Sequence, residues 1–152
     1  MAAEIGAQAP SFSLLDQSKN PVSLDDLKGN KTLVVFIPFP FTGICEGELC
    51  AIRDNLAGLN AFDANVVVIT CHAVPTNNRW SEDNGFEFPV LSDFWPHGTV
   101  AKAYGAFNET VGAANRQTFV LDEGGTVRAI VKTDSLGTPR EFDEYVEALA
   151  AF

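Results

Sequence analysis

The sequence predicts an α/β fold in which helices flank a mixed central β-sheet. Two uninterrupted apolar runs, at residues 33–37 and 66–70, are rich in β-branched side chains and fit central strands that are covered on both faces. Helical patterns follow both runs, and strands that alternate with helices are typical of layered α/β proteins. Near the end of the chain, a turn at residues 122–125 joins two further strand candidates into a hairpin. The 152 residues are predicted to form one domain over residues 1–152.

The elements follow one another along the chain in a regular order. Strands at residues 11–15 and 22–24 flank a polar turn and predict an N-terminal β-hairpin, and a short helix at residues 24–27 follows it. The other expected elements are a strand at 32–37, a helix through Cys45 to about residue 58, a strand at 66–70, a loop at 71–76, a helix at 77–84, a strand at 88–92, a helix at 100–104, strands at 117–121 and 126–132, and a helix at 139–149.

The net charge of −10 argues against two classes of partner. The Lys and Arg residues form no cluster, which disfavours nucleic acids and anionic membrane surfaces. The N-terminus has no basic segment followed by an apolar one, and the longest apolar run is far shorter than the roughly 20 residues that span a bilayer. We therefore expect a cytoplasmic protein. Three cysteines, an odd number, indicate reactive or buried thiols rather than a disulfide framework.

The segment at residues 38–50 contains the candidate site. It follows the apolar strand at 32–37 and leads into a helical pattern, so Cys45 is expected in the first turn of a helix. A helix N-terminus offers unpaired backbone N–H groups and the positive end of the helix dipole, and both favour a thiolate over a thiol. The alternative for Cys45 is a buried core cysteine without reactivity.

The residues near Cys45 are of the types that peroxide reduction needs. Breaking an O–O bond requires a thiolate nucleophile, because a thiol with an unperturbed pKa of about 8.5 is mostly protonated at neutral pH. Thr42 can donate its hydroxyl to the thiolate or to a peroxide oxygen. Pro38 and Pro40 remove backbone donors and stiffen a loop that shields the sulfur. Arg116, just before a strand, is the best candidate for an additional cation; the alternative is a surface salt bridge.

Three further residues are candidates for supporting roles. Glu48 lies three residues after Cys45 on the same helix face and could orient Arg116. The alternative for Glu48 is a solvated helix carboxylate. Phe39 and Phe41 could line an apolar mouth that suits organic peroxides, and core or interface packing is the alternative for both.

Several motifs together resemble the peroxiredoxin family. The pattern Pro38-x-x-x-Thr42-x-x-Cys45 resembles its active-site motif, Glu48 matches its glutamate, and Asn115-Arg116-x-Thr118-Phe119 is similar to its arginine segment. Residues 39–49 and 92–98 are most similar to the alkyl hydroperoxide reductase E type. The resemblance implies a thioredoxin-like fold with an N-terminal β-hairpin extension.

The resemblance also implies a reaction cycle. Cys45 would attack hydrogen peroxide or an alkyl hydroperoxide and become a sulfenic acid. Thr42, Arg116 and the backbone N–H groups of Ile44 and Cys45 would hold the peroxide oxygens, while Pro38 shields the sulfur. A thiol would then reduce the sulfenic acid, for which relatives often use mycothiol with mycoredoxin, or a thioredoxin-like protein. The family further implies a homodimer or higher oligomer and no cofactor.

Cys50 departs from the one-cysteine pattern of this type. The spacing Cys45-x4-Cys50 resembles instead the bacterioferritin-comigratory type, in which the second cysteine resolves the sulfenic acid. Residues five apart in a helix are separated by about 7.5 Å along the axis and about 140° around it, whereas a disulfide needs Cα atoms within roughly 4.4–6.8 Å. The first turns must therefore unwind, which Gly43 and Gly47 make easier by about 1 kcal/mol each. We expect an intramolecular Cys45–Cys50 disulfide.

Other interpretations remain open. The chain could be a one-cysteine peroxidase that a low-molecular-weight thiol or mycoredoxin reduces directly, or a non-enzymatic peroxide sensor that passes oxidation to a partner. A thiol–disulfide oxidoreductase is disfavoured because no C-x-x-C follows Cys45. Cys50 could instead be a packed core residue. Cys71 is expected in the core, with a resolving thiol as the alternative. A metal site at Cys45, Cys50, Cys71 and His72 lacks paired C-x2-C spacing, so we expect no metal.

Overall fold

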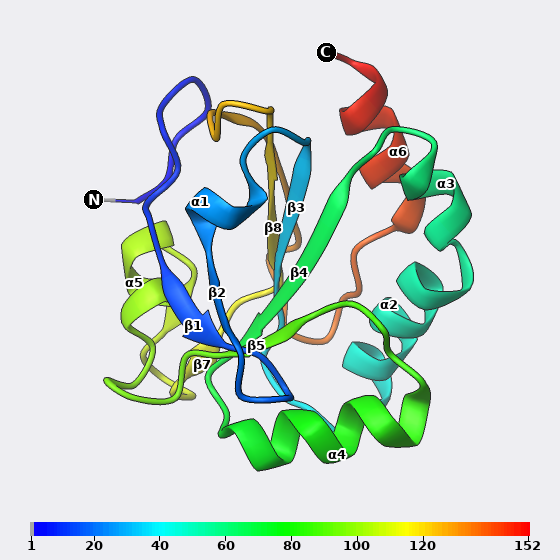
Figure 1. The fold of residues 1–152 in the computed structure, drawn as a ribbon. Helices are drawn as coiled ribbons and strands as arrows, with labels where there is room; N and C mark the ends of the chain where they lie inside the picture. The colour runs from blue at the N-terminus through cyan, green and yellow to red at the C-terminus, as the bar shows by residue number, and fades with distance from the viewer. Residues whose placement is uncertain (1) are drawn as a thin grey trace.

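The computed structural model describes residues 2–152 and confirms the predicted α/β class (Figure 1). Its strands are β1 (Ser13–Leu15), β2 (Pro21–Ser23), β3 (Thr32–Phe36), β4 (Asn65–Thr70), β5 (Val90–Ser92), β6 (Phe107–Asn108), β7 (Ala113–Ala114), β8 (Gln117–Leu121) and β9 (Val127–Lys132). Its helices are α1 (Leu24–Leu27), α2 (Gly43–Asp54), α3 (Leu56–Asn60), α4 (Val74–Asn84), α5 (Thr99–Tyr104) and α6 (Phe142–Ala150).

Seven strands form one mixed sheet in the order β2-β1-β5-β4-β3-β8-β9. At its centre, β3 pairs in parallel with β4 and antiparallel with β8. The expected N-terminal hairpin, β1 with β2, joins this sheet because β1 pairs with β5. Since β3 and β8 are direct neighbours, the residues that follow β3 and those that precede β8 emerge at the same edge of the sheet.

The sheet separates two apolar core layers, as expected for central strands buried on both faces. Alternate residues of β3 point to opposite layers: Val34 and Phe36 pack with α1 and α5, whereas Leu33 and Val35 pack with α2, α4 and α6. Successive side chains of a strand point to opposite faces, so a continuous apolar run is what two covered faces require. Figure 1 shows α2, α3, α4 and α6 on one side of the sheet and α1 and α5 on the other.

The predicted helix through Cys45 to about residue 58 is wrong at its end. The helix α2 ends at Asp54, and the separate helix α3 begins at Leu56. Between them, Asn55 has φ of −119° and ψ of 22°, and its side-chain amide donates to the Ala51 carbonyl oxygen at 2.7 Å. Asparagine side chains compete with the helical backbone in this way, which explains the break.

Other elements also differ from the sequence prediction: the strands expected at 11–15 and 88–92 are shorter, Ser13–Leu15 and Val90–Ser92. Residues 74–76 belong to α4 rather than to a loop, because Pro75 lies in the first turn, where its missing N–H would have no helical partner. The short hairpin of β6 with β7 was not predicted, since two-residue strands carry no detectable alternation. The last helix begins at Phe142, three residues later than predicted.

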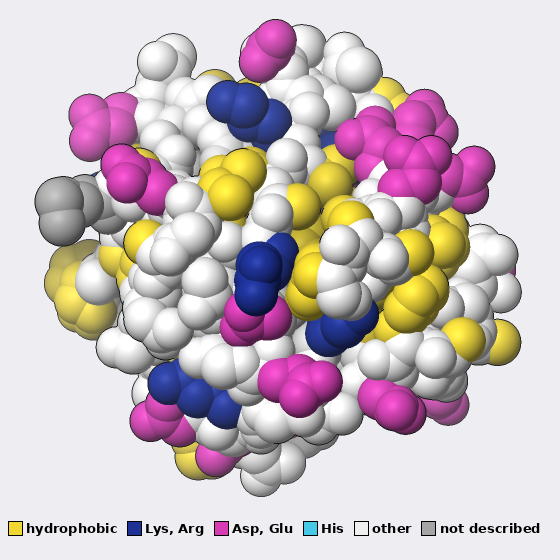
Figure 2. Space-filling view, turned by 90° about the horizontal axis from the view of Figure 1, so that it is seen from above, with side chains coloured by type: hydrophobic (Ala, Val, Ile, Leu, Met, Phe, Trp, Pro, Cys, Tyr) yellow, Lys and Arg dark blue, Asp and Glu magenta, His cyan; other side chains and the backbone are white. Residues whose placement is uncertain are grey.

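The charge pattern of the surface agrees with the composition. On the face drawn in Figure 2, Lys and Arg side chains lie singly between acidic and apolar ones, and no continuous basic patch forms there. No helix within residues 2–152 combines the length and the apolar character that crossing a membrane requires.

The glycine before α5 provides a test of the packing on the side opposite α2. Gly98 has φ of +70°, and a Cβ there would lie 2.4 Å from Cε1 of Phe107. We predict that Gly98→Ala lowers the free energy of unfolding by about 2–4 kcal/mol, through left-handed strain and overpacking together. Urea denaturation measures this loss. The matched change Gly58→Ala, in open space on α3, should be neutral or stabilising. An unchanged urea midpoint for Gly98→Ala would contradict the close packing of Phe107 against residue 98.

Candidate active site

Cys45 lies where the sequence places it, in the first turn of a helix that follows a central strand. The chain leaves β3 through a short loop, Thr42 is the N-cap residue, and α2 begins at Gly43. The loop prolines Pro38 and Pro40 are buried, and Cys45 itself is fully buried. Its sulfur therefore sits at the positive end of the α2 dipole in a site shielded from bulk water.

Arg116 reaches the sulfur directly. Its Nη1 lies 3.2 Å from Sγ of Cys45, and its Nε donates to the Leu136 carbonyl oxygen at 2.7 Å. Arg116 immediately precedes β8, whose pairing with β3 brings the two segments together. The structure thus joins Arg116 and Cys45 as the sequence predicts.

Glu48 is buried and contacts the same arginine. Its Oε1 accepts a hydrogen bond from Nη1 of Arg116 at 2.6 Å, so one guanidinium nitrogen touches both the carboxylate and the sulfur. The alternative of a solvated helix carboxylate is wrong, because Glu48 is only 6% exposed.

Arg140 is a member of the site that the sequence analysis missed. Its Nε donates to Oε2 of Glu48 at 2.8 Å and its Nη2 to Oε1 at 3.0 Å, while its backbone N–H donates to Oε2 at 2.7 Å. Its remaining nitrogen donates to Oγ1 of Thr118, which also bonds the Tyr145 hydroxyl. No pattern in the sequence marked Arg140, because its role depends on the burial of Glu48, which the fold decides.

The two arginines determine the charge of the cluster. Burial raises the pKa of Glu48, but the hydrogen bonds and charge of Arg140, with the charge of Arg116, outweigh burial and hold that pKa below its ordinary value. Glu48 is therefore ionised at neutral pH, and two guanidinium groups with one carboxylate leave one net positive charge beside Cys45. A net cation next to a sulfur favours its thiolate form.

The Thr42 hydroxyl does not bond the sulfur in this structure. It donates instead to the Phe39 carbonyl oxygen at 2.7 Å, and Thr42 is exposed. Phe39 is half-buried with its ring centroid 6.0 Å from that of His72. Phe41 is exposed and has φ of +64°. Its ring centroid lies 6.4 Å from that of Trp80. The two aromatic residues thus belong to the loop before Cys45 and contact His72 and Trp80.

The first turn of α2 has a second attachment, to α4. Nε1 of Trp80, a fully buried residue, donates to Oε1 of Glu46 at 2.9 Å. The N-cap residue Thr42 makes no side-chain cap bond, and Gly43 and Gly47 lie in the first two turns. The Trp80 bond therefore supports a helix start that its own residues stabilise weakly.

The three cysteines are free thiols in different environments. Cys50 is half-buried on α2, five residues beyond Cys45 along an intact helix. Cys71 is buried, as expected of a core residue, and burial together with the nearby Asp93 carboxylate raises its pKa to about 12. Within residues 2–152, no group of three or more His, Cys, Asp or Glu side chains is arranged to hold a metal ion.

A groove runs alongside the charged cluster. It has a volume of about 320 Å³ and lies between α2 and the start of α6. Its lining residues are Ile44, Gly47, Glu48, Ala51, Pro139, Arg140, Glu141 and Phe142. Ile44, Ala51, Pro139 and Phe142 give the groove apolar surface, while the side chains of Glu48 and Arg140 are buried beneath it, so it suits an apolar chain.

The lowered pKa of Glu48 predicts how stability depends on pH. A depressed pKa in the folded state contributes stability that is present above the ordinary value of 4.5 and is lost as the pH falls through the folded value. We expect the difference in unfolding free energy between the wild type and Glu48→Gln to shrink as the pH falls below the ordinary value of 4.5. Urea denaturation at each pH measures it. Glu109→Gln, at an exposed position, is the control and should change the unfolding free energy little at any of these pH values. If the effect of Glu48→Gln on the unfolding free energy were also the same at every pH, that result would contradict a buried ion pair at Glu48.

Comparison with known proteins agrees with this geometry. Residues 5–130 match the family model described as AhpC/TSA family. The alkyl hydroperoxide reductase E of Mycobacterium tuberculosis strain H37Rv is 45% identical over 148 residues, covering 97% of this chain and 96% of the relative. A thioredoxin peroxidase of Echinococcus granulosus is 31% identical, over 100% of this chain and 82% of the relative.

Solved structures confirm the expected fold. The crystal structure of peroxidoxin BcpB from M. tuberculosis superposes with a TM-score of 0.88 at 27% identity, covering 99% of this chain and 98% of that one. AhpC of M. tuberculosis, at 24% identity and a TM-score of 0.86, shares the fold over 99% of this chain. The family model, the near full-length relatives and the fold together establish that the chain is a peroxiredoxin of the AhpC/TSA family, a thiol-dependent peroxidase.

Proposed function

We propose that this peroxidase reduces hydrogen peroxide and organic hydroperoxides with Cys45 as its nucleophile. The observation that carries the proposal is the 3.2 Å contact between Nη1 of Arg116 and Sγ of Cys45 inside a buried cluster with net positive charge. A thiolate in that position has both a helix N-terminus and a guanidinium to stabilise it. The name of the relative alkyl hydroperoxide reductase E supports the choice of substrate class.

The chemistry follows from these groups. The Cys45 thiolate attacks one peroxide oxygen, the S–O bond forms as the O–O bond breaks, and the sulfur is oxidised to a sulfenic acid. The other oxygen leaves as hydroxide or alkoxide and takes up a proton to become water or alcohol. Arg116 and the backbone N–H groups of Ile44 and Cys45 stabilise the negative charge that moves onto this oxygen. The Thr42 hydroxyl would join them when it turns away from the Phe39 carbonyl oxygen, to which it donates in this structure. Pro38 shields the sulfur.

Glu48 and Arg140 position the catalytic arginine. Nη1 of Arg116 faces both the sulfur and Oε1 of Glu48, while Arg140 holds Glu48 through both of its carboxylate oxygens. The carboxylate is thereby fixed, and it fixes the guanidinium at the site of the reaction.

The groove between α2 and α6 favours peroxides that carry an alkyl chain. Ile44, Ala51 and Phe142 supply apolar surface to the groove. Phe39 and Phe41, in the loop before α2, would contribute to the mouth of the site. The alkyl group of an organic hydroperoxide would occupy this groove while its peroxide oxygens reach the sulfur.

Cys50 is the proposed resolving cysteine. Its thiol would attack the Cys45 sulfenic acid, forming an S–S bond and releasing water. The first turns of α2 must unwind for this reaction, and the missing side-chain cap at Thr42 together with Gly43 and Gly47 makes unwinding easier. A thioredoxin-like protein or mycoredoxin would then reduce the disulfide.

A one-cysteine cycle is the second candidate. The observation in its favour is that Cys45 and Cys50 lie on one intact helix, to which Trp80 ties the first turn through Glu46. A low-molecular-weight thiol such as mycothiol would then reduce the sulfenic acid directly.

We further propose a homodimer that forms beside the site. Large apolar side chains are exposed there and in the loop after β5, and Trp95 is 82% exposed. The other members of this surface are Phe41, Ile44 and Phe94. A second copy of the chain would cover them.

The decisive test of the cycle is a thiol count and intact mass after one equivalent of peroxide without reductant. We expect the loss of two thiols within one chain and a linked Cys45–Cys50 peptide. Cys50→Ser should instead gain one oxygen at Cys45, and Cys71→Ser, as the control, should behave like the wild type. If the wild type lost only one thiol per chain, the two-cysteine cycle would be wrong and the one-cysteine cycle would take its place. No reaction at Cys45 would refute its role as the nucleophile.

A substitution at Arg140 tests the positioning of Arg116. Arg140→Lys keeps the charge but loses the two-point contact with Glu48, so we expect the rate of Cys45 oxidation by peroxide to fall about tenfold or more. Stopped-flow kinetics measure the rate, and circular dichroism verifies the fold. Arg128→Lys, at a half-exposed ion pair with Asp122, is the matched control and should leave the rate unchanged. Equal rates for both variants would remove Arg140 from the proposed site.

A further inference from the structure

His72 contacts the loop that leads to Cys45 at two points. Its Nε2 lies 3.3 Å from the carbonyl oxygen of Pro38, and its ring centroid lies 6.0 Å from that of Phe39, with the two rings at 66°. His72 comes from the segment between β4 and α4, whereas Pro38 and Phe39 follow β3. Because β3 and β4 are parallel neighbours, both segments leave the sheet at the same edge and meet there.

The contact with Pro38 determines the tautomer of the His72 ring. A carbonyl oxygen accepts hydrogen bonds and cannot donate one, so Nε2 of the ring carries a proton and donates it. Burial lowers the pKa of His72 below its ordinary value of 6.5, which keeps the ring neutral at neutral pH. A neutral imidazole has a single N–H group, and here that group is used in the bond to the loop.

The backbone of His72 is bonded on both sides. Its N–H donates to Oγ1 of Thr70 at 3.1 Å, and its carbonyl oxygen accepts from Oγ of Ser92 at 2.6 Å. Thr70 is the last residue of β4 and Ser92 the last residue of β5, and these two strands are adjacent and parallel. The imidazole is therefore attached to the central sheet, which gives it a fixed position from which to contact the loop.

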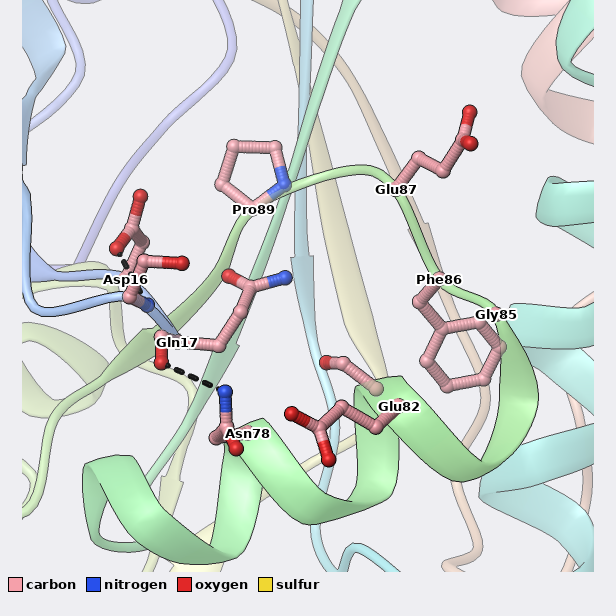
Figure 3. A pocket seen from close by; sticks show the side chains of 10 residues that line it. Asp16, Gln17, Asn78, Glu82, Gly85, Phe86, Glu87 and Pro89 are labelled. Carbon is pink, nitrogen blue, oxygen red and sulfur yellow. Dashed lines mark hydrogen bonds between the residues drawn. The ribbon is translucent and has the colours of Figure 1, made fainter.

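The helix α4 holds Thr70 from the other side. Oγ1 of Thr70 donates to Oδ1 of Asn77, a fully buried residue in the first turn of α4, at 2.8 Å. The next residue, Asn78, donates to the Gln17 carbonyl oxygen at 3.1 Å, and Figure 3 shows this bond between α4 and the N-terminal hairpin. The Thr70 hydroxyl thus donates to Asn77 and accepts from His72, and a hydroxyl that does both has a fixed orientation.

The loop itself needs support from its neighbours. Pro38 and Pro40 have no backbone N–H, so the loop has two donors fewer with which to hold its own conformation. Phe41 has φ of +64°, a left-handed conformation that is unfavourable for a bulky side chain and persists only where the surroundings hold it. His72 supplies such a hold, through a hydrogen bond at Pro38 and a ring contact at Phe39.

We propose that His72 is a positioning residue for the peroxidase reaction, because it holds Pro38 and Phe39 in place over Cys45. The inference rests on the proposed role of Cys45 as the nucleophile. His72 acts through the loop and not on the peroxide. When the loop is released, Pro38 no longer shields the sulfur and the peroxide meets a less ordered site, so its attack by the thiolate slows.

The test compares two amide substitutions that differ by one methylene group. The amide nitrogen of glutamine is as many bonds from Cα as Nε2 of histidine, so His72→Gln can still donate to the Pro38 carbonyl oxygen. The amide of asparagine is one methylene shorter, so His72→Asn cannot reach this oxygen. We expect His72→Asn to lower the rate of Cys45 oxidation by hydrogen peroxide about fivefold or more, and His72→Gln to keep most of the wild-type rate. Stopped-flow kinetics measure these rates.

Alkylation of Cys45 by iodoacetamide is a second readout, which separates positioning from a general loss of stability. Peptide mass spectrometry gives the rate at Cys45, and urea denaturation verifies that each variant is folded under the conditions used. We expect His72→Asn to be alkylated faster than the wild type although it reacts more slowly with peroxide, because release of Pro38 opens access to the sulfur. His72→Gln should stay close to the wild type in both reactions.

His97→Asn is the matched control. It is the same substitution at the other histidine, and it also removes a bond between Nε2 and a loop carbonyl oxygen, that of Gly112 at 2.6 Å. His97 lies in the loop between β5 and α5, so its substitution should leave both rates at Cys45 unchanged.

Four results would overturn the inference. These are a wild-type peroxide rate in His72→Asn, an unchanged alkylation rate in that variant, equal losses in His72→Asn and His72→Gln, or an equal loss in His97→Asn. A wild type that is not oxidised at Cys45 would refute the proposed nucleophile itself, and the inference with it. The two kinds of failure are distinguishable, because only the second appears in the wild type.

Discussion

A buried carboxylate held between two arginines is the interaction on which the proposed active site depends. Glu48 comes from α2, Arg116 precedes β8, and Arg140 precedes α6, so one carboxylate ties three segments that are distant in sequence. Burial of an ion is unfavourable unless partners compensate it, and here both carboxylate oxygens accept charged hydrogen bonds. The result is a fixed net positive charge beside Cys45.

The sheet makes this arrangement possible. Because β3 lies between the parallel neighbour β4 and the antiparallel neighbour β8, the loop that leads to Cys45 and the segment that carries Arg116 leave the sheet at one edge. Apolar layers on both faces hold β3 rigid. The covered sheet thus supplies the precision that a contact of 3.2 Å between Arg116 and Cys45 requires.

The start of α2 must serve two opposing requirements under the proposed cycle. Attack on peroxide needs Cys45 held at the helix N-terminus, whereas resolution by Cys50 needs the same turns to unwind. The helix start is correspondingly balanced: Gly43 and Gly47 weaken it, and the bond from Trp80 to Glu46 supports it. The balance between these terms determines how long Cys45 stays in the reactive arrangement.

The sequence by itself determined the α/β class, the central strands and the position of Cys45, because apolar runs and turn residues act over a few neighbouring positions. Its motifs also indicated Arg116 and Glu48. Only the tertiary structure decided that Arg140 completes the cluster and that His72 reaches the Pro38 carbonyl oxygen. These contacts join residues far apart in the chain, and no local pattern specifies which distant partner a side chain meets. The break at Asn55 and the early start of α4 were missed for a related reason, since single side-chain bonds and one proline decide them.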